Sequence, residues 1–512
     1  MAGRLYDRIR RAAVAGGPGS AVTSPAAELG HRQLLAAADR LAVALGDDPG
    51  PVLLYGHKEP ALVAALVAAL RLVRPYVPAD VSVPAGRLVQ VLDLVRPTAV
   101  VAAQPLPAPA AAALARLGAR AVTTDAGGGV VTVTAGTPPG DRRLVAGEVA
   151  YVMCTSGTTA TPKGVVVPYR GLDHFLGWLL AEQGFAAATE VFLNQAPFHF
   201  DLSVMDVYSA LLTGGTLFCL DRSEVAEPRR LYARLAGAPV SVFVSTPSFA
   251  RFCLAEPRFA AGLLPRLGRF LFCGETLPPA VARELLTRFP AAAVWNTYGP
   301  TETTVAVTSV RVTADRLASD EPLPVGRPAP GLEVWVAPAD QPAAALPVGA
   351  TGEMVAAGPQ VALGYLGADH AASGFLTLDD GRRAYRTGDV GHRDADGLLY
   401  CDGRRDRQVK LHGYRLELEE VEAHLRRLVG VADAAVLAVR RGGRADHLVA
   451  FLVPGPGAAL PADDLELGGA VRRALAAQLP AWALPRRVVL LAALPLTAAG
   501  KLDQAALEGL AR

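Results

Sequence analysis

A run of small hydroxyl and glycine residues is the first stretch of this chain whose residue types could do chemistry. Residues 151–167 read YVMCTSGTTATPKGVVV, with a Thr-, Ser- and Gly-rich centre closed by Pro162, Lys163 and Gly164. Glycines let the backbone approach an anion, hydroxyls and amides donate hydrogen bonds, and the lysine adds a positive charge. A polyphosphate suits such a loop, and an ordinary polar surface loop is the competing interpretation.

The loop is not a Walker A motif. That motif, G-x-x-x-x-G-K-[ST], leads directly into a helix. Here Lys163 precedes the second glycine, and the apolar residues 165–167 predict a strand. The pattern therefore predicts strand, loop and strand, and it excludes a P-loop nucleotide hydrolase.

Composition favours a cytoplasmic protein that handles small or local partners. The 512 residues include 50 Lys and Arg against 48 Asp and Glu, so no global field attracts nucleic acid or an anionic membrane. The N-terminus is charged where a signal peptide is apolar, and the longest apolar run, residues 61–73, is too short to span a bilayer. The five cysteines form no C-x-x-C pair, so neither a disulfide framework nor a zinc site is expected.

The elements that must position the loop alternate between strands and helices, which predicts an α/β body with mostly parallel sheets. Polar motifs follow several of the expected strands, and ligands of open α/β sheets bind at that edge. The expected helices cover residues 34–45, 60–73, 172–180 and 279–288, and the expected strands cover residues 51–55, 98–102, 240–244, 270–272 and 292–295.

The last hundred or so residues have a different texture. Charge becomes dense after Asp402, and short alternating segments follow at residues 434–439, 448–453 and 487–491, with a helix expected over residues 470–478. We expect an N-terminal domain of residues 1–402 and a small α+β domain of residues 403–512.

Four further stretches carry a family resemblance. They are HFDLSVMDVY from His199, NTYGPTETT from Asn296, YRTGD from Tyr385 together with GRRDRQVKLHGYRLELEEVE from Gly403, and PLTAAGKLD from Pro495. In this order and spacing, and with the opening loop, the chain resembles the adenylate-forming superfamily, in its amino-acid adenylation branch, over nearly its whole length. The runs NQAPFHFDLSVMDVYSALLTGGTL, STPSFARFCL and FLFCGE look most like the stand-alone D-alanine:carrier-protein ligases.

The resemblance implies a two-step reaction. A carboxylate attacks the α-phosphorus of ATP, with Mg²⁺, to give an acyl adenylate and pyrophosphate, and a carrier-protein phosphopantetheine thiol then attacks the adenylate. The implied fold is a large N-terminal adenylation body, built on mixed, mostly parallel sheets with helices, and a small mobile C-terminal domain. That chemistry needs neutralised phosphates, an aligned carboxylate and exclusion of water.

The resemblance also implies roles for residues around ATP. The phosphate loop comprises Thr155, Ser156, Gly157, Thr158, Thr159 and Lys163, with Ala160 standing where the family usually has Gly. Glu302 matches the magnesium ligand, with capping of a helix start by Thr301 and Glu302 as the alternative interpretation. Asp389 matches the ribose-binding carboxylate, with Arg404 beside it. The remaining residues expected around the nucleotide are Gly274, Glu275, Asn296, Tyr298, Gly299 and Thr301, with Tyr298 stacked on adenine.

Two implied residues belong to the small domain. Lys501 matches the lysine that reaches the substrate carboxylate and the α-phosphate during adenylation; together with Glu302 and Lys163 it forms the expected catalytic set. Asp406 matches the hinge about which the small domain swings between the two steps, bringing residues 410–415 forward.

Asp201 favours an amino acid as the substrate, because it matches the carboxylate that pairs with an α-ammonium group and is generally absent from acyl-CoA ligases. Alanine is expected, with glycine and serine as competitors, since one methylene discriminates by only about 1–3 kcal/mol. Cys273 is either a small core residue or the wall that selects handedness. The other residues expected at the substrate are His199, Leu202, Met205, Ser245, Leu271, Thr297, Val305 and Ala306.

Several functions stay open at this stage. The amino acid could serve D-alanylation of teichoic acids or, as the composition typical of high-GC bacteria also allows, natural-product biosynthesis. A coenzyme A ligase for a small carboxylic acid is disfavoured by Asp201. A catalytically retired module that only binds a carrier is disfavoured by Lys163, Glu302, Asp389 and Lys501.

Overall fold

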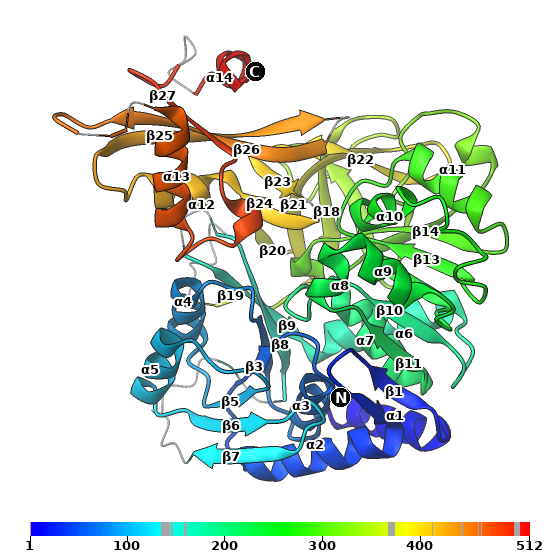
Figure 1. Ribbon diagram of the computed structural model, residues 1–512. Coiled ribbons are helices and arrows are strands. Elements are labelled where there is room, and N and C mark those ends of the chain that lie inside the picture. Colours follow the sequence, from blue (N-terminus) through cyan, green and yellow to red (C-terminus); the bar gives the residue numbers. More distant parts are fainter. Residues whose placement is uncertain are drawn as a thin grey trace. The chain divides into compact units, whose positions relative to one another are not determined.

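The computed structural model describes residues 2–134, 144, 147–157, 161–366, 374–411, 413–441, 444–458, 460–461, 463–495 and 502–511. These residues form two compact units (Figure 1). The first consists of Met1–Val81, Val95–Met153 and Gly164–Arg405, and the second of Ser82–Leu94, Cys154–Lys163 and Asp406–Arg512. The division into a core of residues 1–402 and a mobile domain of residues 403–512 stays a prediction.

One sheet contains the strands on either side of the phosphate loop. Its strand order is β19-β9-β8-β4-β3-β5-β6-β7. The pairs of β3 with β4 and β5, of β4 with β8 and of β5 with β6 are parallel, and Gly56 at the end of β3 lies opposite Asp80 at the end of β4. The bounds are β3 (Val52–Gly56), β4 (Tyr76–Asp80), β5 (Ala99–Ala102), β6 (Arg120–Thr124), β7 (Val130–Thr134), β8 (Val149–Thr155), β9 (Lys163–Pro168) and β19 (Tyr365–Leu366).

Helix α3 (Pro60–Arg71) is buried from Pro60 to Leu70. Its sequence, PALVAALVAALR, is apolar on all faces, which is typical of a helix enclosed by other elements. It contacts α2 (His31–Leu45) and β3, and it also contacts α1 (Ala2–Ala15) and β1 (Ser20–Thr23) (Figure 1). The predicted helices at residues 34–45 and 60–73 are confirmed.

A second sheet of the first unit carries several of the polar motifs. Its order is β16-β15-β14-β13-β12-β10-β11-β1-β2, with β11, β10, β12, β13 and β14 parallel. The carboxyl ends of parallel strands meet at one edge, so residues that follow them converge there. The further bounds are β2 (Glu28–Gly30), β10 (Val191–Asn194), β11 (Thr216–Cys219), β12 (Val242–Ser245), β13 (Arg269–Phe272), β14 (Ala293–Tyr298), β15 (Thr308–Val312) and β16 (Arg327–Pro328).

The helices of this region follow their strands, as an α/β body requires. The predicted helix at residues 279–288 is confirmed at both ends by α11 (Pro279–Arg288), because two prolines suit a helix start. The others are α5 (Ala108–Arg116), α6 (Tyr169–Gln183), α7 (Leu202–Thr213), α8 (Arg222–Ala226), α9 (Pro228–Leu235) and α10 (Pro247–Leu254). Among the described residues, no helix combines the length and the apolar character that crossing a bilayer demands.

A third, antiparallel sheet holds the TGD motif. Its path is β17-β18-β21-β20, with β22 paired to β21. The bounds are β17 (Glu333–Ala337), β18 (Gly352–Ala357), β20 (Phe375–Thr377), β21 (Arg383–Arg393) and β22 (Leu399–Arg404).

The second unit contains a small sheet covered by helices, as predicted for an α+β domain. The strand path is β24-β23-β26-β25, with β27 on β26. Its elements are α4 (Ala85–Val95), β23 (Gln408–Leu411), β24 (Tyr414–Glu417), α12 (Leu418–Leu425), β25 (Val431–Arg441), β26 (Arg444–Pro454), α13 (Asp464–Leu475), β27 (Arg487–Leu490) and α14 (Gln504–Ala511).

The helix expected over residues 470–478 is wrong by several residues, since α13 runs from Asp464 to Leu475. The side chain of Asp463 accepts hydrogen bonds from the backbone amides of Leu465 and Glu466 and so starts the helix early. The Gly-Gly pair inside the helix concealed this start in the sequence.

Candidate active site

Asp389 is the centre of a buried ion pair in the antiparallel sheet. It lies on β21 directly opposite Arg404 on β22, and the guanidinium contacts one carboxylate oxygen. The phenol of Tyr298 donates a hydrogen bond of 2.6 Å to the other oxygen. Burial, reinforced by this carboxylate, raises the pKa of the Tyr298 phenol well above its ordinary value. Three predicted nucleotide-binding residues are therefore brought together, with Arg404 and Tyr298 both in contact with Asp389.

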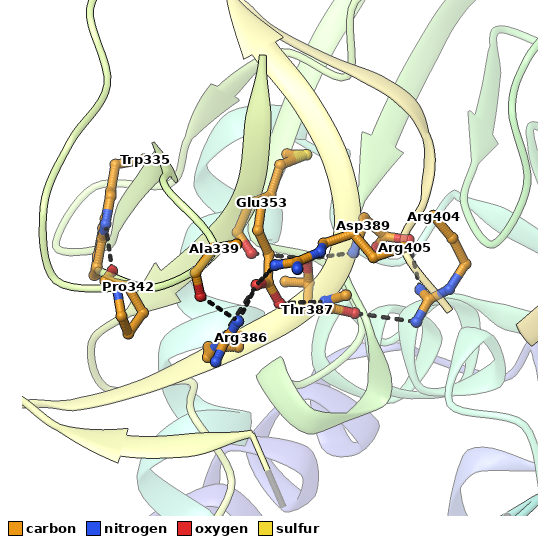
Figure 2. A network of polar contacts seen from close by, with 11 residues as sticks. Trp335, Ala339, Pro342, Glu353, Arg386, Thr387, Asp389, Arg404 and Arg405 are labelled. Atoms are coloured by element: carbon orange, nitrogen blue, oxygen red, sulfur yellow. Dashed lines mark hydrogen bonds and ion pairs between the residues drawn. The ribbon is translucent and has the colours of Figure 1, made fainter. Parts of the chain in front are cut away.

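A second acidic residue, Glu353 on β18, fixes the backbone just before Asp389 (Figure 2). Its carboxylate contacts the guanidinium groups of Arg386 and Arg405, and it accepts a hydrogen bond of 3.1 Å from the amide of Gly388. Figure 2 shows these groups converging beside Asp389. Sequence reasoning missed Glu353, although a charged residue in an otherwise apolar strand was an available signal.

Glu302 lies in a short 3-10 helix, Thr301–Thr303, and is fully buried. The hydroxyl of Tyr365 donates a hydrogen bond of 2.6 Å to its carboxylate, and the Tyr385 hydroxyl lies 3.0 Å from that of Tyr365. The position before the helix is Pro300, so the alternative interpretation of Thr301 and Glu302 as capping residues is wrong. A hard carboxylate with a fixed orientation suits a divalent cation.

The turn after Glu302 is strained. Thr304 and Val305 have φ of 59° and 69°, a left-handed conformation that is rare for β-branched residues. The amide of Gln360 holds this turn, because its nitrogen contacts the carbonyl oxygens of Thr303, Thr304 and Ala306 at 3.2, 3.3 and 2.7 Å. Gln360 is itself fully buried. Sequence reasoning missed it, because the partners lie more than fifty residues apart.

Gly299 precedes the same turn and must be glycine. A Cβ atom there would lie 2.6 Å from the Cα of Ala306 and 2.9 Å from the carbonyl oxygen of Val305. Only glycine, which has no Cβ atom, allows the backbone of residues 305 and 306 to come this close.

Most predicted substrate residues gather in one apolar cluster of the first unit. The Cys273 thiol lies 3.6 Å from the carbonyl oxygen of Val305, which ties the end of β13 to the strained turn. Thr297 donates a hydrogen bond of 2.8 Å to the carbonyl of Phe272. The predicted wall residues that share the cluster are Leu202, Met205, Leu271, Cys273, Val305 and Ala306.

Asp201 and His199 lie on the segment that leads into α7. Asp201 occupies the position before the helix, but its side chain does not cap it. The His199 and Phe200 rings are in contact, tilted by 53° with centroids 4.4 Å apart. Ser245, at the end of β12, donates a hydrogen bond of 3.0 Å to the carbonyl of Thr246.

Around the predicted adenine site, Glu275 accepts a hydrogen bond from the amide of Ser248, and Asn296 donates one to the carbonyl of Pro324. Gly274 has φ of 90°, which favours glycine.

The phosphate loop is described in part. Strand β8 ends at Thr155 and β9 begins at Lys163, so the predicted strand, loop and strand are confirmed, as is the exclusion of a Walker A helix. A Cβ atom on Gly157 would lie 2.2 Å from the carbonyl oxygen of Thr161. The Ser156 hydroxyl donates a hydrogen bond of 3.2 Å to the carbonyl of Arg415 within the second unit. Thr158, Thr159, Ala160 and Lys501 lie outside the described residues.

The predicted hinge residue Asp406 is exposed, and its carboxylate accepts a hydrogen bond of 3.3 Å from the amide of Gln408. Among the described residues, no three acidic, His or Cys side chains group as a complete metal site.

Known proteins resemble this chain along nearly its full length. A family model described as AMP-binding enzyme matches residues 10–366, and another, described as AMP-binding enzyme C-terminal domain, matches residues 420–501. A protein of Bacillus thuringiensis (strain Al Hakam), named D-alanine–D-alanyl carrier protein ligase, is 38% identical over 506 residues, which is 98% of each chain.

Solved structures agree with this likeness. That of IdnL1 has a TM-score of 0.80 and 30% identity, and covers 96% of this chain and 98% of that chain. That of holo-PA1221, an NRPS protein containing adenylation and PCP domains, has a TM-score of 0.79 and 30% identity, and covers 98% of this chain and 83% of that one.

Replacing Gln360 tests whether its amide holds the strained turn. We expect Gln360→Ala to lower the free energy of unfolding by about 2–4 kcal/mol, because three carbonyl oxygens of a strained turn lose their donor. Chemical denaturation measures this change. Gln183 is a matched control: it is 5% exposed, and neither amide atom has a partner among the described residues. Equal losses in Gln360→Ala and Gln183→Ala would contradict the assignment.

Proposed function

This chain belongs to the AMP-binding enzyme family, and from that membership we propose that it activates a small amino acid, D-alanine, as an aminoacyl adenylate and transfers it to the phosphopantetheine thiol of a separate carrier protein. The observation that carries the proposal is the likeness over 98% of the chain to a protein named D-alanine–D-alanyl carrier protein ligase. The contacts around Asp389, Glu302 and the strained turn support it.

Asp389 binds the ribose hydroxyls of ATP in this proposal. Its carboxylate is held by Arg404 and Tyr298, so it meets a ligand in a fixed orientation and little ordering remains to be done on binding. The same hydrogen bond fixes the Tyr298 ring, which faces the adenine. Gly274, Glu275 and Asn296 complete the adenine site.

Mg²⁺ is the cation that the residues fit, with Glu302 as its protein ligand. Magnesium takes one or two carboxylates and completes its octahedron with water and substrate phosphate oxygens, and Glu302 is a buried carboxylate oriented by Tyr365. When bound, the cation neutralises phosphate charge. Lys163 and the hydroxyls of Thr155 and Ser156 provide further donors for the pyrophosphate that leaves.

The amino acid is held at its two charged ends. Asp201 pairs with the α-ammonium group, and such a pairing offsets the cost of enclosing either charge alone. Lys501 reaches the carboxylate and the α-phosphate during the first step. The wall formed by Met205, Leu271 and Cys273 leaves a small volume for the side chain, which favours alanine over larger residues.

Chemistry proceeds by positioning more than by covalent catalysis. The amino-acid carboxylate oxygen attacks the α-phosphorus, the bond from that phosphorus to the bridging oxygen breaks, and pyrophosphate leaves with the electron pair. Asp406 then serves as the hinge that withdraws Lys501 and admits the thiol step. A reaction that consumes ATP in this way suits the cytoplasm.

The first prediction concerns the substrate. Exchange of labelled pyrophosphate into ATP should be fastest with D-alanine and at least about tenfold slower with L-alanine, glycine and L-serine. The reason is that losing one methyl group from an apolar pocket, or misplacing it, changes the binding free energy by about 1–3 kcal/mol. The assay runs the four amino acids side by side at equal concentration. Exchange with none of them would refute the proposal, and L-alanine as the best substrate would reverse the assigned handedness.

The second prediction separates the two steps through Lys501. Lys501→Ala should slow pyrophosphate exchange by about two orders of magnitude or more, because it removes the charge that aligns carboxylate and α-phosphate. Transfer from pre-formed alanyl adenylate to a thiol should change by less than about threefold. Comparable losses in both steps would argue against this role.

The third prediction concerns the hinge. Asp406→Pro fixes φ near −65° at a position that must change conformation, so exchange should continue while carrier loading fails. Single-turnover loading measured beside exchange separates these effects. Full-rate loading by the variant would exclude Asp406 as the hinge. Asp402→Pro is the control. It places a proline on β22, four residues before Asp406, and so tests whether general disturbance of the strand alone causes the loss.

A further inference from the structure

A narrow cavity in the first unit lies behind the segment that bears Asp201. Its volume is about 20 Å³, enough for one small group. Most of its lining is apolar and comes from β3, β4, α3 and α7, and its polar lining includes His57, Asp80, His199 and Ser203. The cavity thus combines an apolar lining with a polar end.

The polar end is a histidine–aspartate pair. His57 follows β3 and Asp80 ends β4, and the parallel register that places Gly56 opposite Asp80 brings the two side chains together. His57 Nδ1 lies 2.5 Å from Asp80 Oδ2, and both residues are more than nine-tenths buried. In a neutral imidazole, a carboxylate partner makes Nδ1 the donor and leaves the lone pair on Nε2. No described residue bonds to Nε2, although it is buried.

Other charged groups surround this pair. Lys58 is buried and donates hydrogen bonds to the carbonyl oxygens of Asn194 and Gln195 at 3.0 and 2.7 Å. Burial lowers the pKa of the Lys58 ammonium to about 8. The titratable and charged groups facing His57 or Lys58 are Glu59 on the same segment, Asp80 on β4, His199 before α7, Asp206 on α7, Cys219 at the end of β11 and Asp221 after β11.

Lysine itself is rare in this chain. Of 50 basic residues only four are lysine, at positions 58, 163, 410 and 501, so arginine fills the other 46. Lysine and arginine are not interchangeable where a compact ammonium group is needed. Three of the four already have a predicted role: Lys163 in the phosphate loop, Lys410 in the segment moved by the hinge, and Lys501 in adenylation. The fourth, Lys58, adjoins His57.

The cavity and the predicted amino-acid pocket share α7. Ser203, Val204 and Val207 line the cavity, whereas Leu202 and Met205 belong to the predicted pocket wall, on another face of the helix. His199 contributes to the cavity two residues before Asp201. The cavity therefore borders the segment that carries the predicted substrate residues.

We propose that His57 is the general base of the transfer step and that Asp80 is its positioning residue. The inference rests on the proposed function, since it assigns the thiol end of the carrier's prosthetic arm to the cavity. His57 Nε2 accepts the thiol proton, the sulfur bonds to the adenylate carbonyl carbon, and the bond from that carbon to the phosphate oxygen breaks. AMP leaves with the electron pair, and the imidazolium is stabilised by Asp80.

The experiment compares the two steps across pH in the full-length protein, with free pantetheine as the thiol. His57→Gln should reduce single-turnover transfer from D-alanyl adenylate about 100-fold at pH 7 and change pyrophosphate exchange by less than twofold. A free thiol ionises near pH 8.5, so the variant's transfer rate should rise about tenfold per pH unit below that value. The difference from the unaltered protein should fall below tenfold at pH 9. Asp80→Asn should show the same pattern with a smaller loss.

The matched control is a second histidine–aspartate pair. His392 Nδ1 lies 2.8 Å from Asp402 Oδ2, but both side chains are about a third exposed. His392→Gln should leave both steps unchanged. A loss of transfer in His57→Gln that is equal at every pH, or that extends to exchange, would overturn the inference. Transfer by His57→Gln at the rate of the unaltered protein would also overturn it. Absence of exchange in the unaltered protein would instead overturn the proposed function, and the inference with it.

Discussion

Burial of carboxylates is the constraint on which the first unit depends. An ionised carboxylate removed from water costs several kcal/mol unless partners compensate it. Asp389 is compensated by Arg404 and Tyr298, and this requires β21 and β22 to pair in one register. Glu302 is compensated by Tyr365. The three sheets of this unit are thus linked at the predicted nucleotide-binding residues.

The strained turn after Glu302 shows the same logic in the backbone. Positive φ at Thr304 and Val305 costs on the order of 1–3 kcal/mol for each residue. Gln360 offsets that cost with its contacts to three carbonyl oxygens. What the strain provides is placement: the carbonyl of Val305 meets the Cys273 thiol, and the turn is tied to the end of β13.

Sequence reasoning located the elements and the motif residues but not their supports. Helix α11 was predictable because prolines mark its start, and the parallel strands because they are short and apolar. Glu353, Gln360 and the pair of His57 with Asp80 were not predicted, since each acts through a partner that only the fold brings near. Asp463 shows why helix boundaries are hard to predict from the sequence: this one capping side chain places the start of α13 several residues earlier than expected.

A two-step enzyme of this family must protect its intermediate from water and yet admit a thiol. The proposed adenylation lysine, Lys501, comes from the C-terminal part of the chain. If that part swings about Asp406 as proposed, it does not present Lys501 during both steps. A base for the second step is better built into the part that does not move. His57 and Asp80 belong to the larger unit, where adjacent parallel strands fix their separation. Their geometry is therefore set before either substrate arrives, which is the condition under which a general base contributes most.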